Sequence, residues 1–224
     1  MIATKRITIF FLLIFSAASI AKAQKKITEG TITYSMAYDL PADKQMMAAT
    51  LPTVVTFYFR GDSTAAIFNQ GVATIKGVSV LKDNFHSLLI DIPSSLKKIA
   101  VVLTPAEVEQ EKAAIPQLTG VRGTEKQMVD GYNCTKEMVT DPKSGATYEI
   151  WLTNDIEVPS NSISRPVSMF GGVPVKFVTF NSGLKINAEI REMKEVPIPA
   201  GFFTPTKEYE RMTYTEFKAM NGQN

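Results

Sequence analysis

Apolar and polar residues alternate one by one along much of this chain. The clearest run covers residues 184–191, where Leu, Ile, Ala and Ile alternate with Lys, Asn, Glu and Arg. Residues 31–38 and 54–59 alternate in the same way. A period of two turns one side of a strand toward a core and the other toward water, which is typical of antiparallel sheets. The alternation therefore predicts a mainly β protein.

Further candidate strands lie between short turn sequences. These strands cover residues 64–68, 74–81, 85–92, 96–103, 125–139, 147–153 and 173–180. The turns between them, rich in Gly, Asn and Asp, cover residues 60–62, 69–71, 82–84, 141–145 and 181–183. Gly131 is interpreted as a bend or bulge within one long strand. Connections this short favour a meander, so we expect a curved antiparallel sheet of about nine to eleven strands.

Two segments are predicted to be helical. Residues 42–50 are rich in Ala, Met, Lys and Gln, and Pro52 ends the segment. Residues 105–114 follow Thr104, a good N-cap residue, with Pro at the first helical position and Glu107 three residues after the cap. We expect such short helices to cover one face of the sheet.

The N-terminus has the three zones of a secretory signal peptide. Lys5 and Arg6 precede a mostly apolar run from Ile7 to Ile20, and Ala21-Lys22-Ala23 gives the small-x-small pattern of a cleavage site. The apolar run is shorter than the roughly 20 residues of a membrane-spanning helix. We therefore predict cleavage after Ala23 and a periplasmic or secreted product that is not an integral membrane protein. No cysteine stands at the cleavage site for lipid attachment.

Cleavage also changes the charge of the protein. The whole chain has 24 Lys and Arg against 22 Asp and Glu, but three of the basic residues lie in the first 23 positions. The mature chain would carry 21 basic and 22 acidic residues, a net charge of −1. A near-neutral surface offers no electrostatic footprint for nucleic acid. Nucleic acid is therefore not an expected partner.

Residues 24–224 are long enough for a single core and are predicted to form one β-rich domain. They contain one cysteine, Cys134, so no intramolecular disulfide can form. In an oxidising compartment this leaves a buried thiol or an intermolecular bridge. Free cysteine is among the most buried residue types, so we expect the buried thiol. Asn133-Cys134-Thr135 matches a glycosylation sequon, which matters only in a glycosylating host.

The motifs of common enzyme classes are absent from the sequence. His86 is the sole histidine, so a His-rich zinc site cannot form, and any Ser-His-Asp triad would have to use this residue. We interpret His86 as an exposed or half-buried structural residue at the start of a strand. No nucleophile elbow, phosphate loop, dinucleotide fingerprint or calcium loop is present, and no cofactor or metal is predicted.

Catalysis by paired carboxylates needs only two acids that the fold brings together. The nominal candidates are Glu149, Asp155, Glu157 and Glu189. Most acids in strands and loops are solvated surface residues. The sequence therefore favours a protein that is not an enzyme, with a carboxylate hydrolase kept as an alternative.

Large apolar side chains occupy strand positions where a two-faced strand would be polar. Trp151 alternates in phase with Glu149, and Phe180 alternates in phase with Lys176. One explanation is a second small core beneath a helix. The other is an apolar cavity between sheet and helices that accepts a lipid-like ligand. The candidate lining residues are Phe57, Phe59, Trp151, Phe177 and Phe180.

Several short motifs resemble a pattern of secreted proteins from Gram-negative bacteria. They are Glu29 to Tyr34, Gly131-Tyr132-Asn133-Cys134, Tyr148 to Ile156, Phe170-Gly171-Gly172-Val173-Pro174-Val175 and Ile198 to Phe202. Together they resemble the GLPGLI family and a related uncharacterised secreted family. Residues 170–175 depart from the full GLPGLI string.

These families are similar in architecture to the LolA/LolB-type lipoprotein carriers. The resemblance implies a half-open antiparallel barrel closed by short helices over an apolar cavity. No cavity arginine of the LolA kind can be assigned, so lipoprotein transfer itself is not implied.

The expected function is a non-enzymatic, exported envelope protein that binds a hydrophobic, lipid-like ligand or an envelope protein in a half-barrel cavity. The first alternative is a structural or interaction module with a filled core. A paired-carboxylate hydrolase is the second.

Overall fold

A computed structural model describes residues 25–113, 115–159, 170–181 and 183–220 of the protein. The predicted signal peptide and its cleavage site lie outside the described residues. The elements, in chain order, are β1 Lys25–Lys26, β2 Glu29–Asp39, η2 Ala42–Ala49, β3 Val54–Arg60, β4 Ser63–Gln70, β5 Ala73–Val80, β6 Phe85–Ile92, η3 Pro93–Ser95, β7 Lys97–Leu103, α2 Pro105–Ala113, β8 Thr119–Val129, β9 Tyr132–Thr140, β10 Thr147–Thr153, β11 Ile156–Glu157, β12 Val173–Asn181, β13 Leu184–Lys194, β14 Glu210–Thr213 and α4 Tyr214–Met220.

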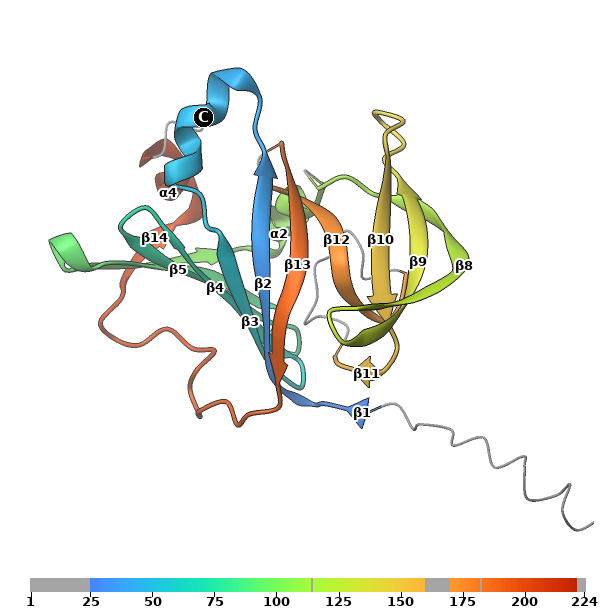
Figure 1. Cartoon of the computed structure of the whole chain (residues 1–224). Coiled ribbons are helices and arrows are strands. Elements are labelled where there is room, and N and C mark those ends of the chain that lie inside the picture. Colours follow the sequence, from blue (N-terminus) through green and yellow to red (C-terminus); the bar gives the residue numbers. More distant parts are fainter. Residues whose placement is uncertain (1–24, 114, 160–169, 182, 221–224) are drawn as a thin grey trace, which may run out of the picture.

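Within the described residues, one sheet of twelve strands dominates the fold, in the order β14-β7-β6-β5-β4-β3-β2-β13-β12-β10-β9-β8. All neighbours in it are antiparallel except β14 and β7. The sheet is strongly curved and does not close into a barrel (Figure 1). The expectation of a mainly β protein with a large, curved antiparallel sheet is confirmed, but the expected count of about nine to eleven strands is too low. A separate parallel pair joins β1 to β11.

The chain enters the sheet in its middle. Strands β2 to β7 form the expected meander toward one edge, while β8 to β10 form a second meander at the other edge. Strands β12 and β13 connect the two halves, because β13 pairs with β2 from Lys185 opposite Asp39 to Lys194 opposite Thr31. The edges are β14 and β8.

The single long strand expected over residues 125–139 is wrong. The structure has two strands there, β8 and β9, joined by a two-residue turn at Asp130 and Gly131. Both turn residues have positive φ, 48° and 84°. This is the backbone that an Asp-Gly pair favours, because it matches the twist of a hairpin. The bend in β8 lies elsewhere, where the register shifts between Arg122 and Lys126.

The helices lie where the sequence places two of them, with differences in type. Residues 42–49 form a 3₁₀ helix, η2, with no buried residue, and α2 begins at Pro105 as expected. The backbone N–H of Thr104 donates to Glu107 Oε2 over 2.7 Å, which is the reciprocal bond of a capping box. The helix α4 was not predicted, although its Thr213 and Glu216 form the same box.

Three hydrophobic clusters hold the sheet together. The largest, here the main core, lies among β2, β9, β10, β12 and β13 and contains Ile32, Tyr34, Ile150, Val175, Phe177 and Ile190. A second lies between β4 to β7 and the segment 196–209, and a third joins β6 and β7 to β14 and α4. The described helices contribute no residue to the main core. Short helices therefore do not cover the main core; α4 packs on β6 and β7 in the third cluster.

Candidate functional site

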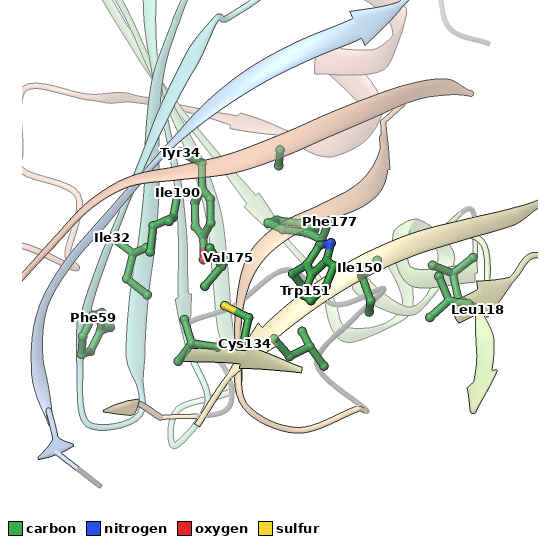
Figure 2. Close-up of a cluster of buried hydrophobic side chains, with 14 of the residues drawn as sticks. Ile32, Tyr34, Phe59, Leu118, Cys134, Ile150, Trp151, Val175, Phe177 and Ile190 are labelled. Carbon is green, nitrogen blue, oxygen red and sulfur yellow. The ribbon is translucent and has the colours of Figure 1, made fainter. Parts of the chain in front are cut away.

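Three of the five predicted lining residues are part of a filled core. Phe59, Phe177 and Trp151 are 0%, 2% and 4% exposed, and all belong to the main core. Figure 2 shows Trp151 and Phe177 beside each other and near Cys134. Side chains this deeply buried contact one another and stabilise the fold. Phe177 also borders a cavity of about 200 Å³, together with Met36 and Ala188.

Tyr34 organises the packing of these aromatic residues. Its ring meets Phe177 edge-on with centroids 5.3 Å apart, and meets Phe57 edge-on at 5.8 Å. Its hydroxyl donates to the backbone carbonyl of Pro174 over 2.9 Å. Burial raises the pKa of Tyr34 far above its ordinary value, so the hydroxyl stays protonated and remains a donor. Tyr34 was not among the predicted lining residues.

Phe57 and Phe180, the other two predicted residues, are half-buried at the rim of the main core. The ring of Phe180 lies edge-on to Tyr148 at 5.8 Å. Phe57 lies on β3, opposite Ile32 on β2 and Ala66 on β4. The structure thus separates the five residues: two remain partly accessible, and they lie on different strands.

The pairing of six strands defines a continuous row beginning at the main core. Residues that lie opposite one another share a face of the sheet, here called the inner face because it carries Ile32 and Tyr34 of the main core. The row is Ile32, Phe57, Ala66, Gly77, Leu88 and Val101. Ile32 at one end belongs to the main core and Val101 at the other end belongs to the third cluster, and both are 0% exposed. The four residues between them are half-buried.

These four residues, with Phe68 and Ile75 in the next row, form what we call the central strip. Phe68 and Ile75 also lie opposite each other and are half-buried. Within strands β3 to β6, the described inner face contains no Asp, Glu, Lys or Arg. The central strip is therefore an uncharged, partly accessible surface between two dry clusters.

Polar residues border the central strip on one side. Thr64, Ser79 and His86 lie opposite one another on β4, β5 and β6. Thr64 and His86 are buried, at 7% and 8% exposure. The expectation of an exposed or half-buried His86 is thus wrong, although its position at the start of a strand is confirmed.

The four candidate carboxylates are divided among three places. Glu149 and Glu189 line one cavity of about 200 Å³ with Lys176, and Asp155 lines another of about 360 Å³. Glu157 pairs with Lys26 at 3.1 Å. Only Glu149 and Glu189 are brought together.

Glu149 is held in its ionised form. Lys136 Nζ lies 2.8 Å from Glu149 Oε2, and the indole N–H of Trp151 donates to Oε1 over 2.7 Å. These bonds lower the pKa of Glu149, the bond from Lys136 most. A general acid needs a raised pKa, so Glu149 has the wrong electrostatic setting for that role.

Two further titratable groups are buried beside the main core. Cys134 is 1% exposed, which confirms the predicted buried thiol, and burial raises its pKa to about 11. Glu137 is 2% exposed, and burial raises its pKa despite Arg122 Nε at 3.7 Å. Sequence alone gave no sign of Glu137, which occupies an ordinary strand position.

Asn133, in the sequon, donates its backbone and side-chain N–H groups to Asp155 Oδ2.

No known protein family model matches this chain, and no curated protein matches it either. In the described part of the chain, no three His, Cys, Asp or Glu side chains gather as metal ligands. No helix among the described residues is long and apolar enough to cross a membrane. The fold and the site define a mainly β protein with a large, open, curved sheet and an uncharged strip on its inner face.

Proposed function

We propose that this protein is an exported, non-enzymatic envelope protein that binds a hydrophobic, lipid-like ligand on the inner face of its sheet. The observation that supports this most is the central strip: six half-buried positions without a charged side chain, four of them in a row between two buried clusters. The resemblance to GLPGLI-type secreted proteins and to the LolA/LolB-type half-barrel is part of the same proposal.

The position of the proposed ligand differs from that expected from the aromatic residues. Phe59, Trp151 and Phe177 have their surfaces occupied by other core residues. The central strip keeps part of its apolar surface accessible, and a ligand that covers it gains the free energy of burying that surface. Of the predicted residues, Phe57 alone lies in the central strip.

Two measurements test binding. The protein is purified from its native host, extracted with organic solvent and analysed by mass spectrometry, and it is titrated with a fluorescent fatty acid. We expect a co-purifying lipid and saturable fluorescence enhancement. An extract without lipid, together with a silent probe, contradicts the proposal.

A pair of matched variants locates the site. Leu88→Glu places a charge in the central strip, whereas Val121→Glu places the same charge at an apolar position that is 78% exposed on β8. We expect Leu88→Glu to abolish probe binding and Val121→Glu to leave it unchanged, with both variants folded by circular dichroism. Equal loss in both, or loss in neither, contradicts a site at the central strip.

Export is tested separately through the mature N-terminus. The proposed cleavage after Ala23 makes Gln24 the first residue of the protein recovered from the envelope fraction. Intact-mass measurement reads this directly. A mass that includes residues 1–23 contradicts a cleaved signal peptide.

An envelope interaction module is the second candidate, and the edge strand β8 favours it. Val121 and Met128 on this strand are 78% and 63% exposed, and an edge strand presents unpaired backbone groups to a partner. Crosslinking in cells from position 128 should capture one reproducible envelope protein, and an uncrosslinked monomer contradicts this candidate.

A further inference from the structure

Most glycines of this protein are required either because a Cβ would clash or because their φ is positive. One glycine in the sheet meets neither condition. A Cβ at Gly30 or Gly123 would lie 2.2 Å from a backbone carbonyl oxygen, and one at Gly120 would lie 2.7 Å from Phe170. Eight others have positive φ. Among the described glycines, Gly77 alone has neither cause: its φ is not positive, and apart from its two chain neighbours no described residue has an atom within 4 Å of the Cβ position.

A glycine in the middle of a strand weakens the fold. It loses more conformational freedom on folding than alanine and packs no side chain. Gly77 lies within β5, paired on both sides with β4 and β6. Glycine at such a position often marks the close approach of a ligand. The open space beside Gly77 points into the inner face, since its partners Ala66 and Leu88 lie on that face.

Four side-by-side residues define this space, which we call the lane. Gly77 and Ala66, side by side on β5 and β4, form a floor of two small residues. Phe57 on β3 and Leu88 on β6 form the walls. Three strand spacings separate the wall backbones, about 14 Å. Between these walls the space beside Gly77 is open, because a Cβ there would meet no described atom within 4 Å apart from its two chain neighbours.

We propose that Gly77 is the specificity-determining residue of the ligand site, because its missing side chain lets the central strip accept one unbranched alkyl chain. This inference rests on the proposed function. The uncharged floor and walls favour an aliphatic chain, and the narrow lane disfavours methyl-branched chains. A side chain at position 77 would occupy the space of the ligand.

Three variants on the same strand test the role of Gly77. Gly77→Leu fills the lane, Gly77→Ala narrows it by one methyl group, and Thr74→Leu places the same leucine side chain on the other face of β5. The probe is dansyl-undecanoic acid. It is displaced by palmitic acid or by phytanic acid, a methyl-branched competitor. Urea unfolding is measured for each variant.

The wild-type protein should bind palmitic acid more tightly than phytanic acid. Gly77→Leu should weaken probe binding at least about tenfold, the equivalent of losing two buried methylene groups. Thr74→Leu should bind the probe as the wild type does. Gly77→Ala should bind palmitic acid as the wild type does and should bind phytanic acid more weakly than the wild type does. This variant replaces Gly77→Leu in the test if Gly77→Leu does not fold.

The inference is overturned if the wild type binds the probe and a folded Gly77→Leu binds it equally well. It is also overturned if phytanic acid binds as tightly as palmitic acid, or if Thr74→Leu weakens binding as much as Gly77→Leu. A wild-type protein that is silent with every probe contradicts the proposed function itself, so the two failures are distinguishable.

Discussion

At the scale of single residues, Tyr34 connects two parts of the sheet. Its ring packs against β3 and β12, and its hydroxyl bonds to the carbonyl of Pro174. Such a buried hydroxyl stabilises only while its partner is present. The alternation of residues 31–38 predicts an inward Tyr34, but no local pattern reveals a partner 140 residues away.

Replacing Tyr34 by Phe removes this bond without removing the ring. We expect Tyr34→Phe to lower the free energy of unfolding by about 1–2 kcal/mol, because the Pro174 carbonyl loses its donor inside the core. Tyr38→Phe, at a half-exposed position of the same strand, should change it by less than about 0.5 kcal/mol. Urea unfolding gives both values, and equal effects would contradict the role of the bond.

The buried thiol makes stability fall in alkaline solution. Burial raises the pKa of Cys134 from 9.0 to about 11, so the folded protein holds this proton more tightly than the unfolded chain. The stabilisation is complete below pH 9 and is lost as the pH rises through 11, at about 2–3 kcal/mol in total. Unfolding at pH 8 and pH 10.5 should show a smaller decrease for Cys134→Ala than for the wild type. A parallel decrease contradicts this prediction.

At the scale of elements, turns and caps show why some boundaries were predictable. The strand β6 and the start of α2 follow from local sequence, because alternation and a capping box act within a few residues. The hairpin turn at Asp130 and Gly131 was also predictable from local sequence, because an Asp-Gly pair favours a two-residue hairpin turn. The interpretation of Gly131 as a bulge did not use this signal. The capping box of Thr213 and Glu216 was likewise a local signal for the start of α4.

Two Gly→Ala replacements should act in opposite directions. Gly131 has φ of 84°, where a Cβ is strained, so Gly131→Ala should destabilise the protein by about 1–2 kcal/mol. Gly77 has ordinary strand φ and open space, so Gly77→Ala should stabilise it by about 0.5–1 kcal/mol. Thermal unfolding compares the pair directly. A destabilised Gly77→Ala would mean that the fold itself needs this glycine.

At the scale of the whole molecule, the C-terminal segment 196–209 covers the outer face of strands β3 to β7. Ile198 and Phe203 complete a cluster with Ala65, Val78 and Leu89. Arg60 lies over the Phe203 ring at 5.6 Å and also donates to the carbonyl of Ile198. This segment thus packs on the outer face of these strands, opposite the face that carries the central strip.

Removing the ring of Phe203 should loosen this cover. Phe203 is 5% exposed, and we expect Phe203→Ala to cost about 3–5 kcal/mol in urea unfolding. Leu81→Ala, at a position 53% exposed, should change stability by less than about 0.5 kcal/mol. A loss below about 1 kcal/mol for Phe203→Ala contradicts a stabilising cover.

The candidate site was less predictable than the fold. Hydrophobicity identified Phe57, Phe59 and Phe177 alike, but their exposure depends on which strands lie opposite them. The central strip arises from pairing across six strands, so its small floor residues, Ala66 and Gly77, carried no local signal. Long-range register decides which apolar residues are filled core and which remain accessible.

The position of β2 also bears on how the chain assembles. The Ser35 hydroxyl donates to the carbonyl of Glu189, 154 residues further along. A chain that emerges N-terminus first can therefore form the β2–β3 hairpin early, but one edge of β2 waits for β13. Closing such distant contacts is slow, and open edges associate with other chains. Nearly the whole protein must emerge before its central strand is protected, and this interval is when a chaperone would be needed most.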